Sequence, residues 1–273
     1  MINLFLSVGM AAATAAYIVA PERAPAAARQ SFTGLNWAHR GLHDITKGIP
    51  ENSMAAFRAA RDGGFGIELD LQLTRDGQVV VFHDANLERM CGVDVRLSCL
   101  TYAELQTYRL KGTDERIPLF ADVLAMIDGQ VPLLVEFKPI RERTALCSKA
   151  LELMRSYHGM LCMESFDPFT VAWFRRNAPD ILRGQLTMKP QRSERRGTGI
   201  NAAVGFALSH VVTNCLSRPH FIAHRLEKKT YAVRLAERMG AMSFAWTSRQ
   251  PGNESGNDGV IFEGYVPQPR YHH

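Results

Sequence analysis

Two histidines end short apolar runs in the first third of the chain, and each stands beside a charged residue. His39 precedes Arg40 in the segment WAHRG, and His83 precedes Asp84 in VVVFHD. The imidazole group titrates near neutral pH, so two such groups in one site suit a general base and a general acid. The pair therefore predicts acid–base catalysis.

Three acidic residues lie on two further apolar runs. Glu68 and Asp70 are two positions apart in IELDLQ, and Glu136 stands two positions before Lys138 in VEFKP. Side chains two apart on a strand point to the same face. Burying these carboxylates without compensation would cost several kcal/mol for each charge. Oxygen ligands without neighbouring thiolates suit a hard cation, so the three acids predict a site for Mg²⁺ or Ca²⁺.

The same acids have a second interpretation. Salt bridges to Arg40 and Lys138 would neutralise them without a metal ion. In the metal interpretation these two cations instead bind a phosphate, Arg40 through its planar fork of N–H donors and Lys138 as a point charge. The chemistry predicted in that case is metal-assisted phosphoryl transfer.

Short apolar runs alternate with amphipathic stretches from residue 35 onward, in a chain of 273 residues that could hold one large α/β domain. Strand-then-helix alternation predicts a parallel sheet with helices outside, and we expect a TIM (β/α)8 barrel. The carboxyl ends of barrel strands meet on one face, so the side chains above would share a pocket. The sequence offers nine strand candidates, one more than an eight-stranded barrel contains. The seventh candidate is the one we consider least certain to be a strand. The candidates are 35–39, 65–73, 78–84, 131–139, 160–167, 181–186, 209–214, 242–247 and 259–264.

An open doubly wound sheet is the alternative fold. It would require a glycine-rich phosphate turn after the first strand. The glycine-rich segment 197–205 follows no clear strand, and we interpret it as a loop. A long helical stretch is expected over residues 221–239.

The domain organisation is read from the same patterns. Residues 35–273 are expected to form the catalytic barrel, with a small helical insertion at about 85–130 after the third strand. Residues 21–34 are rich in proline and alanine, and we interpret them as a linker without a core of its own.

An uncharged apolar run precedes this linker. It approaches the roughly 20 residues that a membrane-spanning helix needs, so residues 1–20 are expected to be an uncleaved transmembrane anchor. The alternative is a cleaved signal segment and a secreted or periplasmic protein. Arg23 and Arg29 follow the run, which favours a catalytic domain on the cytoplasmic side.

Composition narrows the choice of partners. The chain has 32 basic and 27 acidic residues and a net charge of +5, which favours anionic partners such as phosphate-bearing substrates. The basic residues form no stripe, so we expect no nucleic-acid partner.

Five cysteines without a C-x-x-C pair favour free thiols in a reducing compartment. His220 and His224 have no acidic third ligand nearby and are expected at the surface.

The ordered set HRG…PEN…ELD…HD…EFK resembles the glycerophosphodiester phosphodiesterase family over residues 36–266. The resemblance implies a TIM barrel that hydrolyses glycerophosphodiesters to sn-glycerol 3-phosphate and an alcohol. It also implies a role for each matching residue: His39 and His83 in acid–base catalysis, Glu68, Asp70 and Glu136 as ligands of a divalent metal, Arg40 and Lys138 in phosphate binding, Glu51 and Asn52 in support, and Trp246 in the pocket wall.

The mechanism expected is attack by the glycerol 2-hydroxyl on the phosphorus, which benefits from proximity and gives a cyclic phosphate that water then opens. The sequence departs from the usual family pattern at WTSR and DGVIFEG, where Glu263 stands in place of a common aspartate. Two rivals remain at this point. One is a lysophospholipase D-type phosphodiesterase acting on membrane lipids, and the other is a phosphate-binding module without catalysis.

Overall fold

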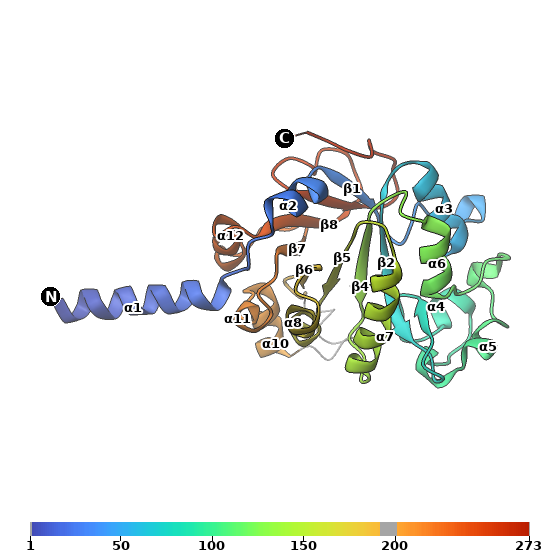
Figure 1. Cartoon of the computed structure of the whole chain (residues 1–273), viewed down its shortest axis with the longest axis horizontal. Coiled ribbons are helices and arrows are strands. Elements are labelled where there is room, and N and C mark those ends of the chain that lie inside the picture. Colours follow the sequence, from blue (N-terminus) through green and yellow to red (C-terminus); the bar gives the residue numbers. More distant parts are fainter. Residues whose placement is uncertain (1, 192–200, 273) are drawn as a thin grey trace.

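Eight parallel strands close into a barrel in the computed structural model, which describes residues 2–191 and 201–272. The strands follow one another around the ring in the order β1-β9-β8-β7-β6-β5-β4-β2, and pairing of β1 with β2 closes it. Helices surround this ring (Figure 1), and the predicted TIM barrel is confirmed. The barrel strands are β1 (Leu35–Ala38), β2 (Gly66–Leu73), β4 (Leu133–Phe137), β5 (Leu161–Ser165), β6 (Leu182–Thr187), β7 (Phe221–Arg225), β8 (Met242–Ser248) and β9 (Gly259–Phe262).

The third predicted strand lies outside the ring. β3 (Val79–Val81) runs antiparallel to β2, with Leu71 opposite Val81. From the hairpin at the carboxyl end of β2, β3 runs back along β2, and the backbone N–H of Phe82 donates to the carbonyl of Asp70. Residues 82–84 therefore lie near the barrel mouth without belonging to a barrel strand.

The sixth strand of the barrel, β7, is the element that the sequence misplaced. The candidate over residues 209–214 is wrong, because Ser209 ends one helix and Asn214 begins the next. Residues 221–225 form β7 instead, and the predicted long helix is reduced to Tyr231–Arg238. The apolar part of FIAHR is only three residues long, and the basic residues around it resemble a solvated helix face.

The outer helices bury one face against the barrel, and a side-chain cap marks the start of α3. The hydroxyl of Ser53 accepts a hydrogen bond from the backbone N–H of Ala56 and caps α3, which buries Ala56, Phe57 and Ala60 against the barrel. The glycine-rich segment contributes to α10, although its residues 197–200 lie outside the described part of the chain. The helices of this layer are α3 (Met54–Asp62), α6 (Phe120–Ile127), α7 (Arg143–Ser156), α8 (Pro168–Asn177), α10 (Ala202–Ser209), α11 (Asn214–Ser217) and α12 (Tyr231–Arg238).

Residues 85–119 pack around a small apolar cluster of their own, which includes Leu87, Met90 and Leu105. That this segment is an insertion, as the sequence suggested for about 85–130, stays a prediction. Its short helices are α4 (Glu88–Cys91), η2 (Leu97–Cys99), α5 (Tyr102–Leu105) and η3 (Leu110–Gly112), and a further turn, η1 (Ile45–Lys47), follows β1.

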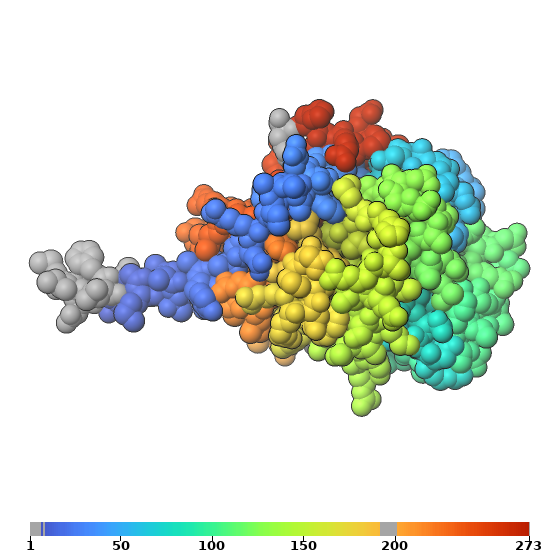
Figure 2. Space-filling model, in the orientation of Figure 1, coloured from blue at the N-terminus to red at the C-terminus, as the bar shows by residue number. Residues whose placement is uncertain are grey.

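The N-terminal helix α1 (Ile2–Val19) extends away from the body of the molecule (Figure 1 and Figure 2). Within residues 2–191 and 201–272, no helix combines the length and apolar character that a bilayer crossing requires. The predicted membrane anchor over residues 1–20 is therefore wrong, and with it the membrane placement built on it. Eighteen helical residues span about 27 Å, short of the roughly 30 Å hydrocarbon layer, and alanine, glycine, serine, threonine and asparagine occupy half of them.

The segment predicted as a linker packs against the barrel. It contains α2 (Ala26–Phe32), whose Phe32 is buried and stacks on Trp37 with ring centroids 6.1 Å apart. Ahead of it, the carboxylate of Glu22 pairs with the fully buried guanidinium of Arg183 at 2.5 Å. Residues 21–34 therefore contribute to the core.

Two histidines expected at the surface are buried. His220 is 3% exposed and accepts a hydrogen bond from the backbone N–H of Arg183, and His224 is 5% exposed beside Asn257. Burial lowers the pKa of His220 to about 4. The surface prediction failed because these residues belong to β7 and its start rather than to a helix. The five cysteines are free thiols.

Candidate active site

A pocket of about 240 Å³ opens at the carboxyl ends of the barrel strands, the face on which TIM-barrel sites are built. Seven of the ten residues that the sequence singled out line it. The other three, Asp70, Glu51 and Asn52, contact this group without lining the pocket. The pocket is lined by His39, Arg40, Glu68, His83, Glu136, Lys138, Glu164, Phe166, Leu186, Trp246, Thr247, Arg249 and Ile261.

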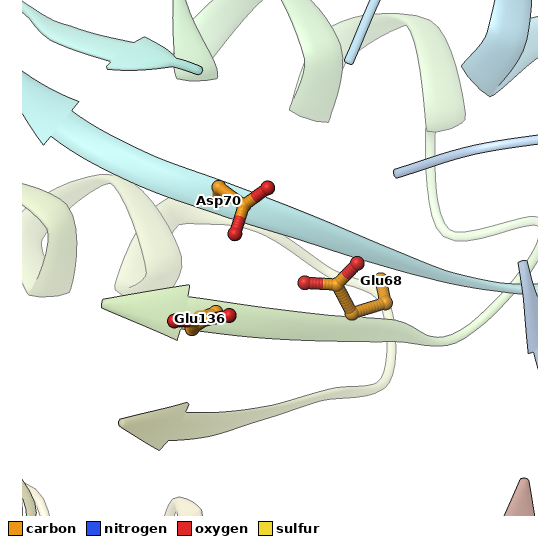
Figure 3. A group of neighbouring side chains, drawn as sticks. All are labelled: Glu68, Asp70 and Glu136. Atoms are coloured by element: carbon orange, nitrogen blue, oxygen red, sulfur yellow. The ribbon is translucent and has the colours of Figure 1, made fainter. Parts of the chain in front are cut away.

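Three buried carboxylates form the base of this site. Glu68 and Asp70 project from β2, and Glu136 projects from the neighbouring strand β4 (Figure 3). Strand register sets Asp70 beside Glu136. One oxygen from each of the three lies within 4.8 Å of the others, and each residue is at most 7% exposed.

The spacing of these oxygens fits a shared cation. Two oxygens bound to one Ca²⁺ at its usual bond lengths are at most about 5.2 Å apart, and the limit is about 4.2 Å for Mg²⁺. The separation of up to 4.8 Å lies within the limit for Ca²⁺, and the oxygens would have to move closer together for Mg²⁺. All three donors are hard oxygens, as both ions prefer.

The salt-bridge interpretation accounts for only part of the charge. Lys138 Nζ lies 2.7 Å from Asp70 and 2.6 Å from Glu136, and Arg40 Nε lies 3.5 Å from Asp70. These two cations leave one formal negative charge on three carboxylates. Burial, together with Asp70 and Glu136, raises the pKa of Glu68 well above its usual value. A divalent ion would turn this excess into one positive charge, which matches a singly charged phosphodiester.

His39 stands directly after β1 and is held by a residue from the far end of the chain. Its Nδ1 lies 2.6 Å from a carboxylate oxygen of Glu263, which follows β9, and Arg249 contacts the other oxygen of Glu263 at 3.1 Å. Burial of the imidazole is the main reason that the pKa of His39 is lowered, although Glu263 opposes the shift. His39 therefore favours its neutral form.

His83 is held by a local carboxylate. Its Nδ1 lies 2.6 Å from Asp84, and Arg89 Nε donates to the other oxygen of Asp84 at 2.6 Å. The same guanidinium donates two hydrogen bonds to Glu51, at 2.7 and 2.8 Å. Burial opposes ionisation of Asp84, but the hydrogen bonds from His83 and Arg89 outweigh it and lower its pKa to about 2.

The PEN segment fixes Arg40 and the acidic cluster. Glu51 accepts a hydrogen bond from Arg40 Nη1 at 2.7 Å, and Asn52 Nδ2 donates to Asp70 at 2.8 Å. The backbone N–H of Arg40 donates to Glu68 at 2.9 Å. Arg40 and Asn52 both adopt positive φ, 55° and 52°, a conformation uncommon for residues other than glycine. This geometry turns their side chains toward the carboxylates.

Aromatic rings form one wall of the pocket. Trp246 donates from Nε1 to the carbonyl of Ala223 at 3.0 Å, and its ring meets Phe166 edge to face at 5.6 Å. These two contacts fix the indole ring in the wall of the pocket.

Sequence reasoning gave no role to five charged residues of this site: Asp84 and Glu263 as partners of the histidines, Arg89 and Arg249 as partners of these two carboxylates, and Glu164 as a pocket residue. The signal for Glu164 was an acidic residue inside the apolar run LCMESF.

A parallel barrel whose strand ends gather carboxylates, imidazoles and cations in one pocket has the architecture of the TIM-barrel enzymes. A sequence profile of the glycerophosphoryl diester phosphodiesterase family matches residues 39–264. The chain therefore belongs to the glycerophosphoryl diester phosphodiesterase family.

Individual relatives carry related names. A lysophospholipase D of Rattus norvegicus is 37% identical over 142 residues, which are 47% of this chain and 43% of that protein. A glycerophosphodiester phosphodiesterase of Caldanaerobacter subterraneus is 31% identical over 160 residues, 55% of this chain and 65% of that protein. The chain thus matches less than half the length of the first of these relatives and under two thirds of the second.

Solved structures share the fold. A phosphodiesterase of Oleispira antarctica in complex with the product sn-glycerol 3-phosphate has a TM-score of 0.68 at 21% identity, over 86% of this chain and 94% of that chain. A glycerophosphodiester phosphodiesterase of Thermotoga maritima has a TM-score of 0.61 at 26% identity, over 84% of this chain and 94% of that chain.

Proposed function

We propose that this protein hydrolyses glycerophosphodiesters to sn-glycerol 3-phosphate and an alcohol, with a divalent cation and two histidines. The observation that carries the proposal is the convergence of three carboxylates within 4.8 Å of one another and two imidazoles on one pocket. Family membership supports the same reaction class.

Glu68, Asp70 and Glu136 would hold the cation, which is Mg²⁺ or Ca²⁺. When bound, the ion supplies electrostatic stabilisation for negative charge on the phosphoryl oxygens. Arg40 and Lys138 line the same pocket and would add to that stabilisation once the ion relieves them of their carboxylate partners.

In the first step His39 acts as the general base, because its lowered pKa favours the neutral form. It takes the proton of the glycerol 2-hydroxyl while that oxygen bonds to phosphorus. The bond from phosphorus to the alcohol oxygen breaks, and His83 gives that oxygen a proton. A five-membered cyclic phosphate results.

In the second step the roles reverse. His83 takes a proton from water as the water oxygen bonds to phosphorus, and the bond to the glycerol O2 breaks with a proton from His39. The histidines recover their starting states, and sn-glycerol 3-phosphate is released. Glu263 and Asp84 hold each imidazole through Nδ1, which leaves Nε2 available to the substrate.

A second candidate function is a lysophospholipase D-type reaction on membrane lipids. The observation that favours it is the rat lysophospholipase D, which is 37% identical over the matched 142 residues. Relative rates on glycerophosphocholine and lysophosphatidylcholine separate the two candidates.

The test is an assay for sn-glycerol 3-phosphate released from glycerophosphocholine. We expect release by the wild-type protein, abolition by EDTA, recovery on adding Mg²⁺ or Ca²⁺, and a large loss in His39→Ala. A substrate without the 2-hydroxyl should not react. Full turnover of that substrate would eliminate the cyclic route, and full activity of His39→Ala would contradict the site assignment.

A further inference from the structure

Glu164 is a buried acid that the mechanism above does not use. It projects from β5 beside Glu136 of β4, as the strand register requires, and it lines the pocket while only 1% exposed. Within the described part of the chain, its Oε2 has no hydrogen-bond partner. Burial and the nearby Glu136 raise the pKa of Glu164 well above its usual value.

Glu164 stands apart from the cation cluster. Among the described residues, the acids whose oxygens gather within 4.8 Å are Glu68, Asp70 and Glu136, and Glu164 is not one of them. A buried polar atom without a partner costs about 1–3 kcal/mol. Such an atom at the wall of a substrate pocket is satisfied most simply by a group of the substrate.

The depth of Glu164 indicates which part of the substrate it meets. Phe166 stands just past the carboxyl end of β5 and is more exposed than Glu164, and the side chain of Arg249 at the opening is 72% exposed. Glu164 therefore lies at the closed end of the pocket. A closed end suits the small, constant glycerol unit, whereas the alcohol that leaves varies in size and needs the open end.

The glycerol unit offers one hydroxyl beyond the 2-hydroxyl that attacks phosphorus. This is the primary hydroxyl on C1, at the carbon farthest from the phosphate. We propose that Glu164 is a specificity-determining residue that accepts a hydrogen bond from the free C1 hydroxyl of the glycerol unit. The proposal rests on the proposed function and extends it to the choice of substrate.

One consequence separates the two candidate functions. A lysophospholipid with an acyl chain on C1 lacks the hydroxyl donor, so the carboxyl of Glu164 would stay unpartnered and the chain would have to fit the closed end. A site built to bind a hydroxyl discriminates strongly against an analogue without it, because its own polar group is then left unsatisfied. Glu164 therefore favours glycerophosphodiesters with a free C1 hydroxyl.

The experiment compares glycerophosphocholine with its 1-deoxy analogue, which keeps the 2-hydroxyl and the phosphocholine. We expect kcat/KM of the wild-type protein to be about 10- to 100-fold lower for the analogue. Glu164→Leu should lower kcat/KM for glycerophosphocholine by a similar factor and leave the analogue nearly unaffected, so that the preference disappears. Glu164→Gln keeps an acceptor oxygen and should retain most of the preference. Glu152→Leu, at an exposed glutamate of α7, is the matched control and should change neither value.

Three results would overturn the proposal. The first is a wild-type protein that turns over both substrates equally, a result that needs no variant to fold. The second is an equal loss on both substrates in Glu164→Leu. The third is a loss of Ca²⁺ or Mg²⁺ affinity in Glu164→Gln, measured by calorimetry, which would make Glu164 a metal ligand. Failure of the wild-type protein to hydrolyse either substrate is a different outcome, because it removes the proposed function itself.

Discussion

The two histidines of the site are each held by a carboxylate and an arginine, but the two supports differ in construction. His83 is supported by its own neighbour Asp84, and Arg89 joins that carboxylate to Glu51 and so to Arg40. His39 is supported by Glu263, which lies 224 positions away, and its arginine, Arg249, is 72% exposed. The support of His83 is a network of several linked side chains. The support of His39 depends on one contact between residues far apart in the sequence.

The two supports place the imidazoles in different surroundings, which is what the proposed division into a base and an acid requires. The side chain of His39 is 16% exposed, and that of His83 is 33% exposed. Burial lowers the pKa of His39 and favours the base form. In the proposed mechanism the more open imidazole of His83, which Asp84 and Arg89 hold, gives a proton to the leaving alcohol.

The largest expected effect comes from removing each histidine in turn. His39→Ala and His83→Ala should each lower kcat/KM for glycerophosphocholine by about 10²- to 10⁴-fold. A glycerol phosphodiester with a p-nitrophenol leaving group needs no acid, so it should restore much of the rate in His83→Ala and little in His39→Ala. Initial rates on the two substrates measure this. Equal rescue of both variants would remove the division of roles.

The next largest effect is expected from Arg89, and replacing Arg249 should change kcat/KM less. Arg89→Met leaves Asp84 and Glu51 without their shared donor, and we expect a loss of about tenfold in kcat/KM. Because Arg89 is 42% exposed, solvent screening limits the accompanying loss of unfolding free energy to about 1–2 kcal/mol. Arg249→Met should change kcat/KM less than about threefold.

Urea denaturation and steady-state kinetics on both arginine variants check this ranking. Arg89→Lys, which keeps the charge but loses the fork of donors, is the matched control and should fall between Arg89→Met and the wild type. A larger effect of Arg249→Met than of Arg89→Met would reverse the comparison of the two supports.

The smallest expected effect is a shift in pH dependence. The carboxylate of Glu263 raises the pKa of His39 against the stronger effect of burial. Glu263→Gln removes the negative charge, so the pKa of His39 should fall further. The base form then persists to lower pH, and the acid limb of the kcat/KM profile should move to lower pH by a fraction of a unit to one unit.

The matched control for this shift is Glu88→Gln, at an exposed glutamate outside the pocket, which should leave the acid limb in place. Movement of the acid limb to higher pH in Glu263→Gln would mean that His39 is not the group that titrates there.

The cluster of acids shows how far the sequence could lead. Glu68 and Asp70 alternate with apolar residues on one strand, and Glu136 occupies the same position on another, so period-two alternation and barrel convergence together predicted their meeting. Arg40 follows from the same argument, since it stands just after β1. His83 reaches the pocket by a different route, because it follows the antiparallel strand β3 outside the ring.

Other features depend on contacts that local patterns do not carry. The pairing of His39 with Glu263 joins residues 224 positions apart, and no local sequence pattern around either residue predicts it. β7 was missed because its apolar run is short and lies among basic residues. Glu164 was read as part of a strand, since only the closed barrel makes a strand interior into a pocket wall.

The central claim is that Glu68, Asp70 and Glu136 share one divalent cation. Calorimetric titration of Ca²⁺ and of Mg²⁺ into the metal-free protein tests it directly, with Glu68→Gln, Asp70→Asn and Glu136→Gln as variants of nearly unchanged shape. We predict one ion bound per chain and an affinity at least tenfold weaker in each variant. Binding of no ion by the wild-type protein, or unchanged affinity in all three variants, would contradict the account.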